Sequence, residues 1–165
     1  MKLASGIAPV AALLHQGVAV GLGTDGCASN NNLDLLQELD TAAKLQKVHY
    51  LDPTILSAPA ALGLATRGSA RLLGLSREVG ALTPGRKADL AVVDLDQPHL
   101  TPVYNPYSQL VYAATGADVQ TVMVHGRVLV RDRELLAFDL EETLARAREL
   151  AQRVTGKPLP VGGCA

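Results

Sequence analysis

The segment Val18-Ala19-Val20-Gly21-Leu22-Gly23-Thr24-Asp25 constrains the fold of this chain more than any other. Its apolar run, 18–24, predicts a strand buried on both faces of a parallel sheet. The run ends in a carboxylate and an Asn/Gly-rich loop, and the carboxyl ends of such strands are where α/β enzymes place their chemistry. The segment therefore predicts an α/β fold with a functional site at Asp25.

Helical patterns flank this strand, and a single strand between helices is not a complete sheet. Both of its edges would carry unpaired backbone groups on an apolar segment, which is an aggregation hazard unless neighbouring strands cover them. We therefore expect the neighbouring strands to come from a preceding segment or from another chain. Helices are predicted over residues 7–16, over about 33–48 with Asn32 as the cap, from Asp52-Pro53, and from Ser57-Ala58-Pro59 to Leu73.

The pattern changes near Leu75, where short β-type runs separated by turn residues replace the helical spacing. An amphipathic helix is then predicted over 141–154, before a Pro/Gly-rich tail that we expect to be mobile. The β-type runs are 79–82, 89–94, 121–125 and 127–131. The predicted division of the chain is 1–74, 75–136, 137–154 and 155–165.

Charge and composition exclude several classes of partner. Fifteen basic residues against sixteen acidic ones give a net charge of -1, so the chain has no basic face for nucleic acid or an anionic membrane. No apolar run approaches the roughly 18 residues of a membrane span, and the N-terminus lacks a signal-peptide pattern, so we expect a cytoplasmic location. With only Cys27 and Cys164, a disulfide framework is not expected.

Asp25 is the leading candidate for chemistry. A carboxylate at the carboxyl end of a buried strand can ligate a divalent metal, accept a proton from the attacking water, or both. The alternative is a turn or cap role, since Asp-Gly is a common turn pair. Ser29 and Asn30 are candidates for substrate contact, together with Thr24 and Gly26 at the rim, although loop and helix-cap roles also explain the asparagines.

Cys27 and the histidines are weaker candidates for a catalytic or metal-binding role. Cys27 would need a neighbouring base to act as a nucleophile, and none is evident. The histidines are spaced too irregularly for a local metal-ligand pattern, so surface and cap roles are expected for them. They are His15, His49, His99 and His125.

Two stretches carry a resemblance to the metal-dependent amidohydrolases, most closely to the 5-methylthioadenosine/S-adenosylhomocysteine deaminase group and its chlorohydrolase-like relatives. Both stretches occur in the family's order, and the resemblance covers about residues 1–154. The first is Lys2 to Val10 followed by Gly17-Val18, Gly23-Thr24-Asp25-Gly26 and Ala28-Ser29-Asn30-Asn31; the second is Gly80 to Leu90 running into Val92-Val93-Asp94.

The resemblance implies the C-terminal fragment of a (β/α)8 barrel, with 18–24 as its last strand, plus part of a small β-sandwich domain. It implies hydrolytic deamination of an adenosine-like nucleoside, with Asp25 as catalytic residue and metal ligand and with Ser29 and Asn30 at the substrate. It also implies a divalent metal, zinc being favoured over iron, and a site completed outside this sequence. The fragment alone is therefore expected to be inactive, and relatives of this kind are often homo-oligomers.

Two other interpretations stay open at this stage. One is a non-catalytic subunit that pairs with another chain across the edges of 18–24. The other is a relative with different chemistry, such as a triazine or guanine hydrolase, because substrate choice depends on barrel loops that this sequence lacks.

Overall fold

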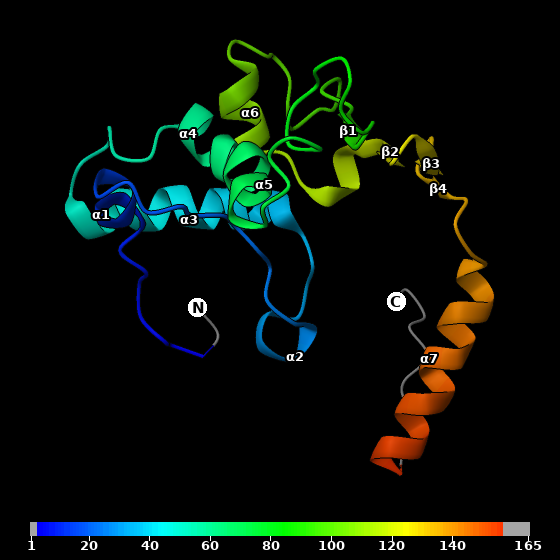
Figure 1. Ribbon diagram of the computed structural model, residues 1–165. Helices are drawn as coiled ribbons and strands as arrows, with labels where there is room; N and C mark the ends of the chain where they lie inside the picture. The colour runs from blue at the N-terminus through cyan, green and yellow to red at the C-terminus, as the bar shows by residue number, and fades with distance from the viewer. Residues whose placement is uncertain (1–2, 157–165) are drawn as a thin grey trace.

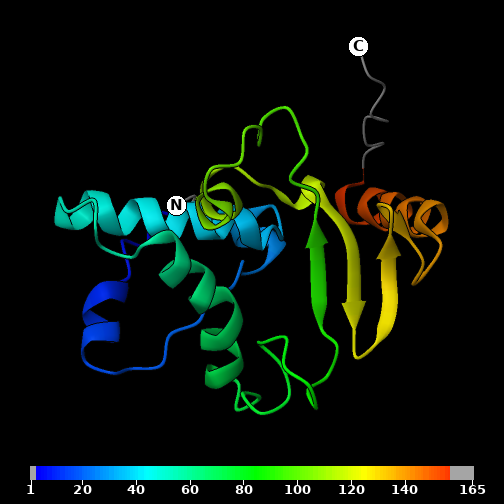
Figure 2. The same cartoon turned by 90° about the horizontal axis from the view of Figure 1, so that it is seen from above.

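A computed structural model describes residues 3–156, and it divides into a helical layer and a small sheet (Figure 1). Viewed from above, the helices lie to one side and the strands to the other, with α7 (Leu140–Thr155) beyond the strands (Figure 2). The helical layer contains α1 (Val10–His15), α2 (Cys27–Asn30), α3 (Leu35–Tyr50), α4 (Ala58–Gly63), the π-helix η1 (Leu64–Gly68), α5 (Ser69–Leu72) and α6 (Pro106–Tyr112).

The helix α3 forms the base of the layer, and its predicted N-cap is wrong. Asn32 was expected to cap it, but the cap is Asp34, whose carboxylate accepts hydrogen bonds from the amides of Leu36 and Gln37. Asp34 has the extended backbone that an N-cap requires, so its oxygens reach the first turn. The same carboxylate accepts the amide of Gly116 at 2.8 Å and so joins the helical layer to the residues that precede β2.

The core lies where α3, α4 and α6 meet. Leu39 and Ala43 of α3, Ala61 of α4 and Val111 of α6 are almost completely buried. Burying a leucine or valine side chain contributes roughly 1.5–3 kcal/mol. The helical layer therefore has a packed interior, although it is built from short helices.

The predicted strand 18–24 is not a strand in the structure. These residues pair with no strand among residues 3–156. A strand needs a neighbouring strand to complete its ladder of hydrogen bonds. Instead, the segment lies against α5: the Ser69 hydroxyl is 3.2 Å from the amide of Leu22 and 3.3 Å from its carbonyl. The Ser69 contacts and a hydrogen bond from the amide of Val18 to the carbonyl of Leu13 hold the run, and Val18 is still 45% exposed.

Two glycines permit this close approach. A Cβ added at Gly21 would lie 2.9 Å from the Cα of Ser69, and one at Gly68 would lie 2.7 Å from the carbonyl oxygen of Val20. Both distances are below any real Cβ contact, so larger residues would push the segment away from the helix. The path of the chain toward Asp25 therefore depends on these glycines.

The small sheet has four antiparallel strands in the order β1-β2-β3-β4. Val122 pairs with Ala91 of β1 and with Val130 of β3, and β1 and β2 are joined across a long connection that includes α6. The strands are β1 (Leu90–Val93), β2 (Val119–Val124), β3 (Arg127–Arg131) and β4 (Glu134–Leu135). A 3-10 helix, η2 (Gly116–Asp118), leads into β2.

Comparison with the sequence prediction gives three confirmed strands and several corrections. The run 79–82 forms no strand, and the helix expected from Asp52-Pro53 is a turn in which Asp52 accepts hydrogen bonds from the amide and hydroxyl of Thr54. Such a local side-chain bond competes with helix formation. The first helix is shorter than 7–16, and α2, α6 and β4 were missed. A single antiparallel sheet is present, without a second sheet facing it among residues 3–156.

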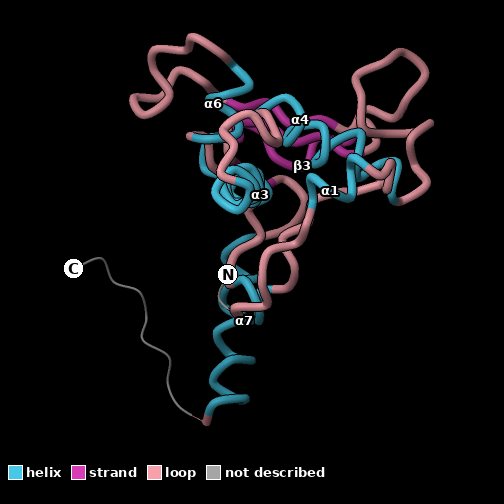
Figure 3. The backbone as a smooth tube through the Cα atoms, turned by 90° about the vertical axis from the view of Figure 1, so that its left-hand side faces the viewer, coloured by secondary structure: helices cyan, strands magenta, loops and turns pink. Residues whose placement is uncertain are grey.

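The last helix, α7, confirms the prediction over 141–154. Asp139 caps it by accepting the amide of Glu142, and Gly156 ends it in a left-handed conformation. The helix extends away from the sheet on one side of the molecule (Figure 3). Most of the tail predicted to be mobile, 157–165, lies outside the described residues. No helix in the described part is long and apolar enough to cross a membrane.

Candidate active-site loop

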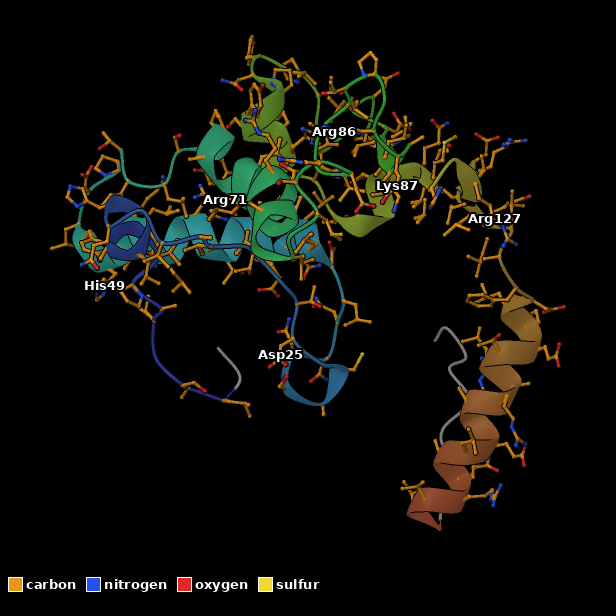
Figure 4. The ribbon with its side chains drawn as sticks, in the orientation of Figure 1. Asp25, His49, Arg71, Arg86, Lys87 and Arg127 are labelled. Atoms are coloured by element: carbon orange, nitrogen blue, oxygen red, sulfur yellow. The ribbon has the colours of Figure 1, made fainter. Side chains whose placement is uncertain are left out.

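Asp25 lies on the loop between the 18–24 segment and α2, which hangs below α3 (Figure 4). Its backbone is left-handed, with φ of 59°, a conformation in which aspartate is tolerated better than most residues. This turn brings the carboxylate back over the start of α2. Oδ1 accepts the amide of Gly26 at 2.7 Å, and Oδ2 accepts the hydroxyl of Ser29 at 2.6 Å.

These two hydrogen bonds set the charge state of the exposed carboxylate. The Ser29 hydroxyl and, to a smaller extent, the Gly26 amide hold the pKa of Asp25 below its usual range. Hydrogen bonds to the charged form of a carboxyl group favour ionisation. Asp25 is therefore an oriented anion at neutral pH, which suits a metal ligand or a proton acceptor.

Asn30 stabilises the loop from inside. Its side-chain amide donates to the carbonyl of Thr24 at 3.0 Å and to Oε1 of Glu38 at 2.6 Å. The two predicted substrate residues, Ser29 and Asn30, are thus placed beside Asp25, and both bond to the protein. Glu38, in the first turn of α3, was missed by the sequence analysis; an acidic residue early in the helix after the loop was the available signal.

An open cavity of about 190 Å³ lies at this loop. Its walls come from the loop itself, from the segment before α1 and from α3. The lining residues are Leu3, Ala4, Ser5, Gly6, Gly23, Thr24, Asp25, Ser29, Asn30 and Glu38. Two carboxylates, Asp25 and Glu38, therefore share one small polar cavity.

The remaining candidates do not line this cavity. His49 stands at the far end of α3 (Figure 4), about 21 Å along the helix axis from Leu35 by the α-helical rise. His99 contacts Asp118 at 3.1 Å, and His125 is at the hairpin between β2 and β3. Cys27 is a free, exposed thiol.

The fit of a divalent metal to this loop is partial. Within residues 3–156 no three His, Cys, Asp or Glu side chains come together to hold an ion. The exposed, ionised carboxylate of Asp25 suits one ligand position, and hard or borderline cations accept such oxygens. A complete site would need further ligands from outside the described residues.

Comparison with known proteins identifies the family. The Amidohydrolase family profile matches residues 1–129. The chain therefore belongs to the amidohydrolase family, as its two stretches of resemblance had indicated.

Two curated relatives show which amidohydrolases this chain is similar to. The chain is 56% identical over 154 residues to a 5-methylthioadenosine/S-adenosylhomocysteine deaminase of Syntrophus aciditrophicus, covering 93% of this chain and 35% of that protein. It is 50% identical to a 5'-deoxyadenosine deaminase of Methanothermobacter thermautotrophicus, covering 94% of this chain and 36% of the relative. The chain thus spans little more than a third of the length of these curated relatives.

Solved structures agree in fold. A zinc-bound adenosine deaminase from Xanthomonas campestris superposes with a TM-score of 0.92 at 41% identity, covering 94% of this chain and 36% of that one. An atrazine chlorohydrolase from Arthrobacter aurescens TC1, a mutant complexed with zinc and atraton, gives a TM-score of 0.76 at 38% identity, covering 88% and 32%. The helical layer and the small sheet therefore belong to the architecture of this family.

Proposed function

We propose that this chain is the C-terminal part of a metal-dependent amidohydrolase that deaminates an adenosine-like nucleoside, of the methylthioadenosine or S-adenosylhomocysteine type. The observation that carries the proposal is the Asp25 loop, an ionised and oriented carboxylate within a sequence 56% identical to a deaminase over 93% of its length. The (β/α)8 barrel, with 18–24 as its last strand, and the β-sandwich are the finer architecture that we infer from the family. A cytoplasmic location is part of this proposal.

Asp25 acts as one metal ligand and as a proton acceptor in this proposal. Water adds to the ring carbon that bears the amino group, the C–N bond to that group breaks, and ammonia leaves. Asp25 takes a proton from the attacking water, and this proton passes to the departing amino group, which leaves as ammonia. Ser29 and Gly26 orient the carboxylate for this step. A divalent cation, when bound, lowers the pKa of that water. The zinc-bound structures of relatives support zinc over iron.

We propose that Ser29 and Asn30 contact the substrate. Both line the cavity with Asp25, and both are half-buried. Their bonds to Asp25 and Glu38 mean that substrate contact would add to a role in shaping the loop. The substrate's amino-bearing ring would enter from the open side of this cavity.

The 165-residue chain alone is expected to be inactive. Its loop offers one carboxylate ligand, and the apolar run 18–24 has no ladder partner within residues 3–156. An upstream part of the protein would provide both the neighbouring strands and the other ligands. We also propose that the whole enzyme forms a homo-oligomer.

The test is a chimera in which this chain replaces the 154 matched residues of the Syntrophus relative. We expect the chimera to release ammonia from methylthioadenosine, and Asp25→Asn to lower kcat/KM by about 10²- to 10⁴-fold. Asp96→Asn, an exposed carboxylate in the sheet region, is the control and should keep full activity. An unchanged rate in the Asp25 variant, or Asp25-dependent activity in the 165-residue chain alone, would overturn the proposal.

A second candidate is a non-catalytic subunit that pairs with another chain. The unpaired apolar run 18–24 favours it, since a separate protein could cover that run. A third is a triazine or guanine hydrolase, and the fold likeness to atrazine chlorohydrolase supports keeping it. The intact mass of the protein in its cells separates the subunit from the enzyme, and ammonia or chloride release by the chimera separates the two chemistries.

A further inference from the structure

The helix α7 has a one-sided apolar surface that the rest of the described chain leaves uncovered. Residues spaced alternately by four and three positions form a single stripe along it, and none of them is buried. Every charged residue of the helix lies off this stripe. The stripe consists of Leu140, Leu144, Ala147, Ala151 and Val154.

A groove accompanies the stripe. An open cavity of about 490 Å³ follows one edge of it, between Phe138 and the helix. Thr143, Ala147 and Leu150 form part of its wall, and the small side chain of Ala147 lets another backbone approach closely. Phe138 itself is 56% exposed. Asp139, Glu142 and Arg146 also line this cavity, so the helix presents a continuous apolar stripe beside a shallow cavity of mixed lining.

Such a helix needs a partner. A helix of 16 residues is marginal in water by itself, and most helical stability in proteins comes from packing an apolar face. Its charges are balanced, with three acidic residues and three basic ones, so an anionic lipid surface gains no electrostatic attraction to it. A protein surface is the occupant that this chemistry fits.

The position of α7 indicates which protein surface covers the stripe. The helix and the Asp25 loop extend to the same side of the α3 layer (Figure 1). Whatever completes the site at Asp25 must approach from that side. The chain spans 35% of the length of the Syntrophus relative, so about two thirds of a comparable protein is available to pack on that side.

We infer that the apolar stripe of α7 packs against the upstream part of the same enzyme, the part that also completes the Asp25 site; this inference rests on the proposed function. In that arrangement the upstream part contacts both α7 and the Asp25 loop. A second copy of the chain covering α7 would leave the run 18–24 unpaired, so one upstream body accounts for more of the exposed apolar surface.

Hydrogen exchange on the chimera with the Syntrophus relative tests the inference. Amides of α7 between 143 and 154 are expected to exchange at least about 100-fold more slowly in the chimera than in the 165-residue chain. Equal rates would overturn the inference. Protection that instead appears in the free chain and rises with its concentration would assign the stripe to a second copy, and would overturn it too.

A matched pair of variants isolates the stripe. Ala147 is on it and Ala145 is on the opposite, exposed side, so Ala147→Asp and Ala145→Asp make the same change at similar helical cost. In the chimera, Ala147→Asp should abolish most of the protection and Ala145→Asp should preserve it. Equal loss in both variants would contradict the inference.

Two further measurements separate failure of the inference from misfolding of the chimera and from failure of the proposed function. If the chimera does not fold, aspartate is placed in the Syntrophus relative at the positions aligned with Ala147 and Ala145, and only the first should lower its melting temperature. Ammonia release is followed separately. A protected α7 in an inactive chimera would sustain the inference and overturn the proposed function, and an active chimera with an unprotected α7 would do the reverse.

Discussion

The run 18–24 and the strand β2 are both short and rich in valine, and yet only β2 is a strand. β2 has β1 and β3 on its two sides, and β3 follows it through a tight hairpin at His125-Gly126. The run 18–24 pairs with no strand among residues 3–156 and is held at Ser69. A strand forms only where neighbouring strands complete its ladder, so one of these valine-containing runs is a strand and the other is an unpaired segment.

The largest difference expected between these two segments is in the protection of their backbone amides from hydrogen exchange. In the 165-residue chain, the amides of Val122 and Val130 should exchange at least about 10³-fold more slowly than those of Val20 and Gly21. The ladder must open before the first pair exchanges, whereas the second pair has no ladder. Comparable rates, measured by NMR or mass spectrometry, would show that 18–24 finds a partner in the free chain.

The contact that replaces the ladder can be broken at Gly68. Gly68→Ala should lower the free energy of unfolding by about 1–3 kcal/mol, because its Cβ would meet the carbonyl of Val20 at 2.7 Å. Gly63→Ala is the matched control: it is also helical and has open space around it, so it should stabilise by about 0.5–1 kcal/mol. Chemical denaturation measures both. The same sign at both positions would contradict the close packing of 18–24 on the helix.

The smallest effect concerns the start of β2. Burial alone would raise the pKa of Asp118, but the amide and hydroxyl of Thr115 together with His99 outweigh it and hold that pKa below its usual range. A lowered carboxyl pKa stabilises the fold above the unfolded-state value of about 3.9 and loses that effect as pH falls through the folded value. Asp118→Asn should therefore cost about 1 kcal/mol near pH 7 and less below about pH 4.

Denaturation of both proteins from pH 7 to pH 3 measures this difference. Asp96→Asn, which removes a charge at an exposed position, is the control. A stability difference between wild type and Asp118→Asn that grows on acidification would have the wrong sign, and would mean that Asp118 is not stabilised in its ionised form.

Much of this arrangement is determined by local sequence. The spacing of apolar residues placed α3 and α7, and alternating β-type runs with turn residues placed β1, β2 and β3. The Asp25 loop was found because a carboxylate follows an apolar run, and the Asp-Gly pair favours the turn that the loop adopts. These are short-range properties, so one sequence is enough to read them.

The remainder depends on contacts between distant residues. Asp34 rather than Asn32 caps α3 and also binds Gly116, 82 residues away, and no local pattern distinguishes the two candidate caps. Glu38 joins the site through Asn30, and Ser29 bonds to Asp25 because the left-handed turn folds the chain back over α2. The sequence by itself determined the family, the helices α3 and α7 and the carboxylate at the end of 18–24. Only the tertiary structure decided that this run would be a segment packed on a helix, because a ladder needs partners that local sequence cannot supply.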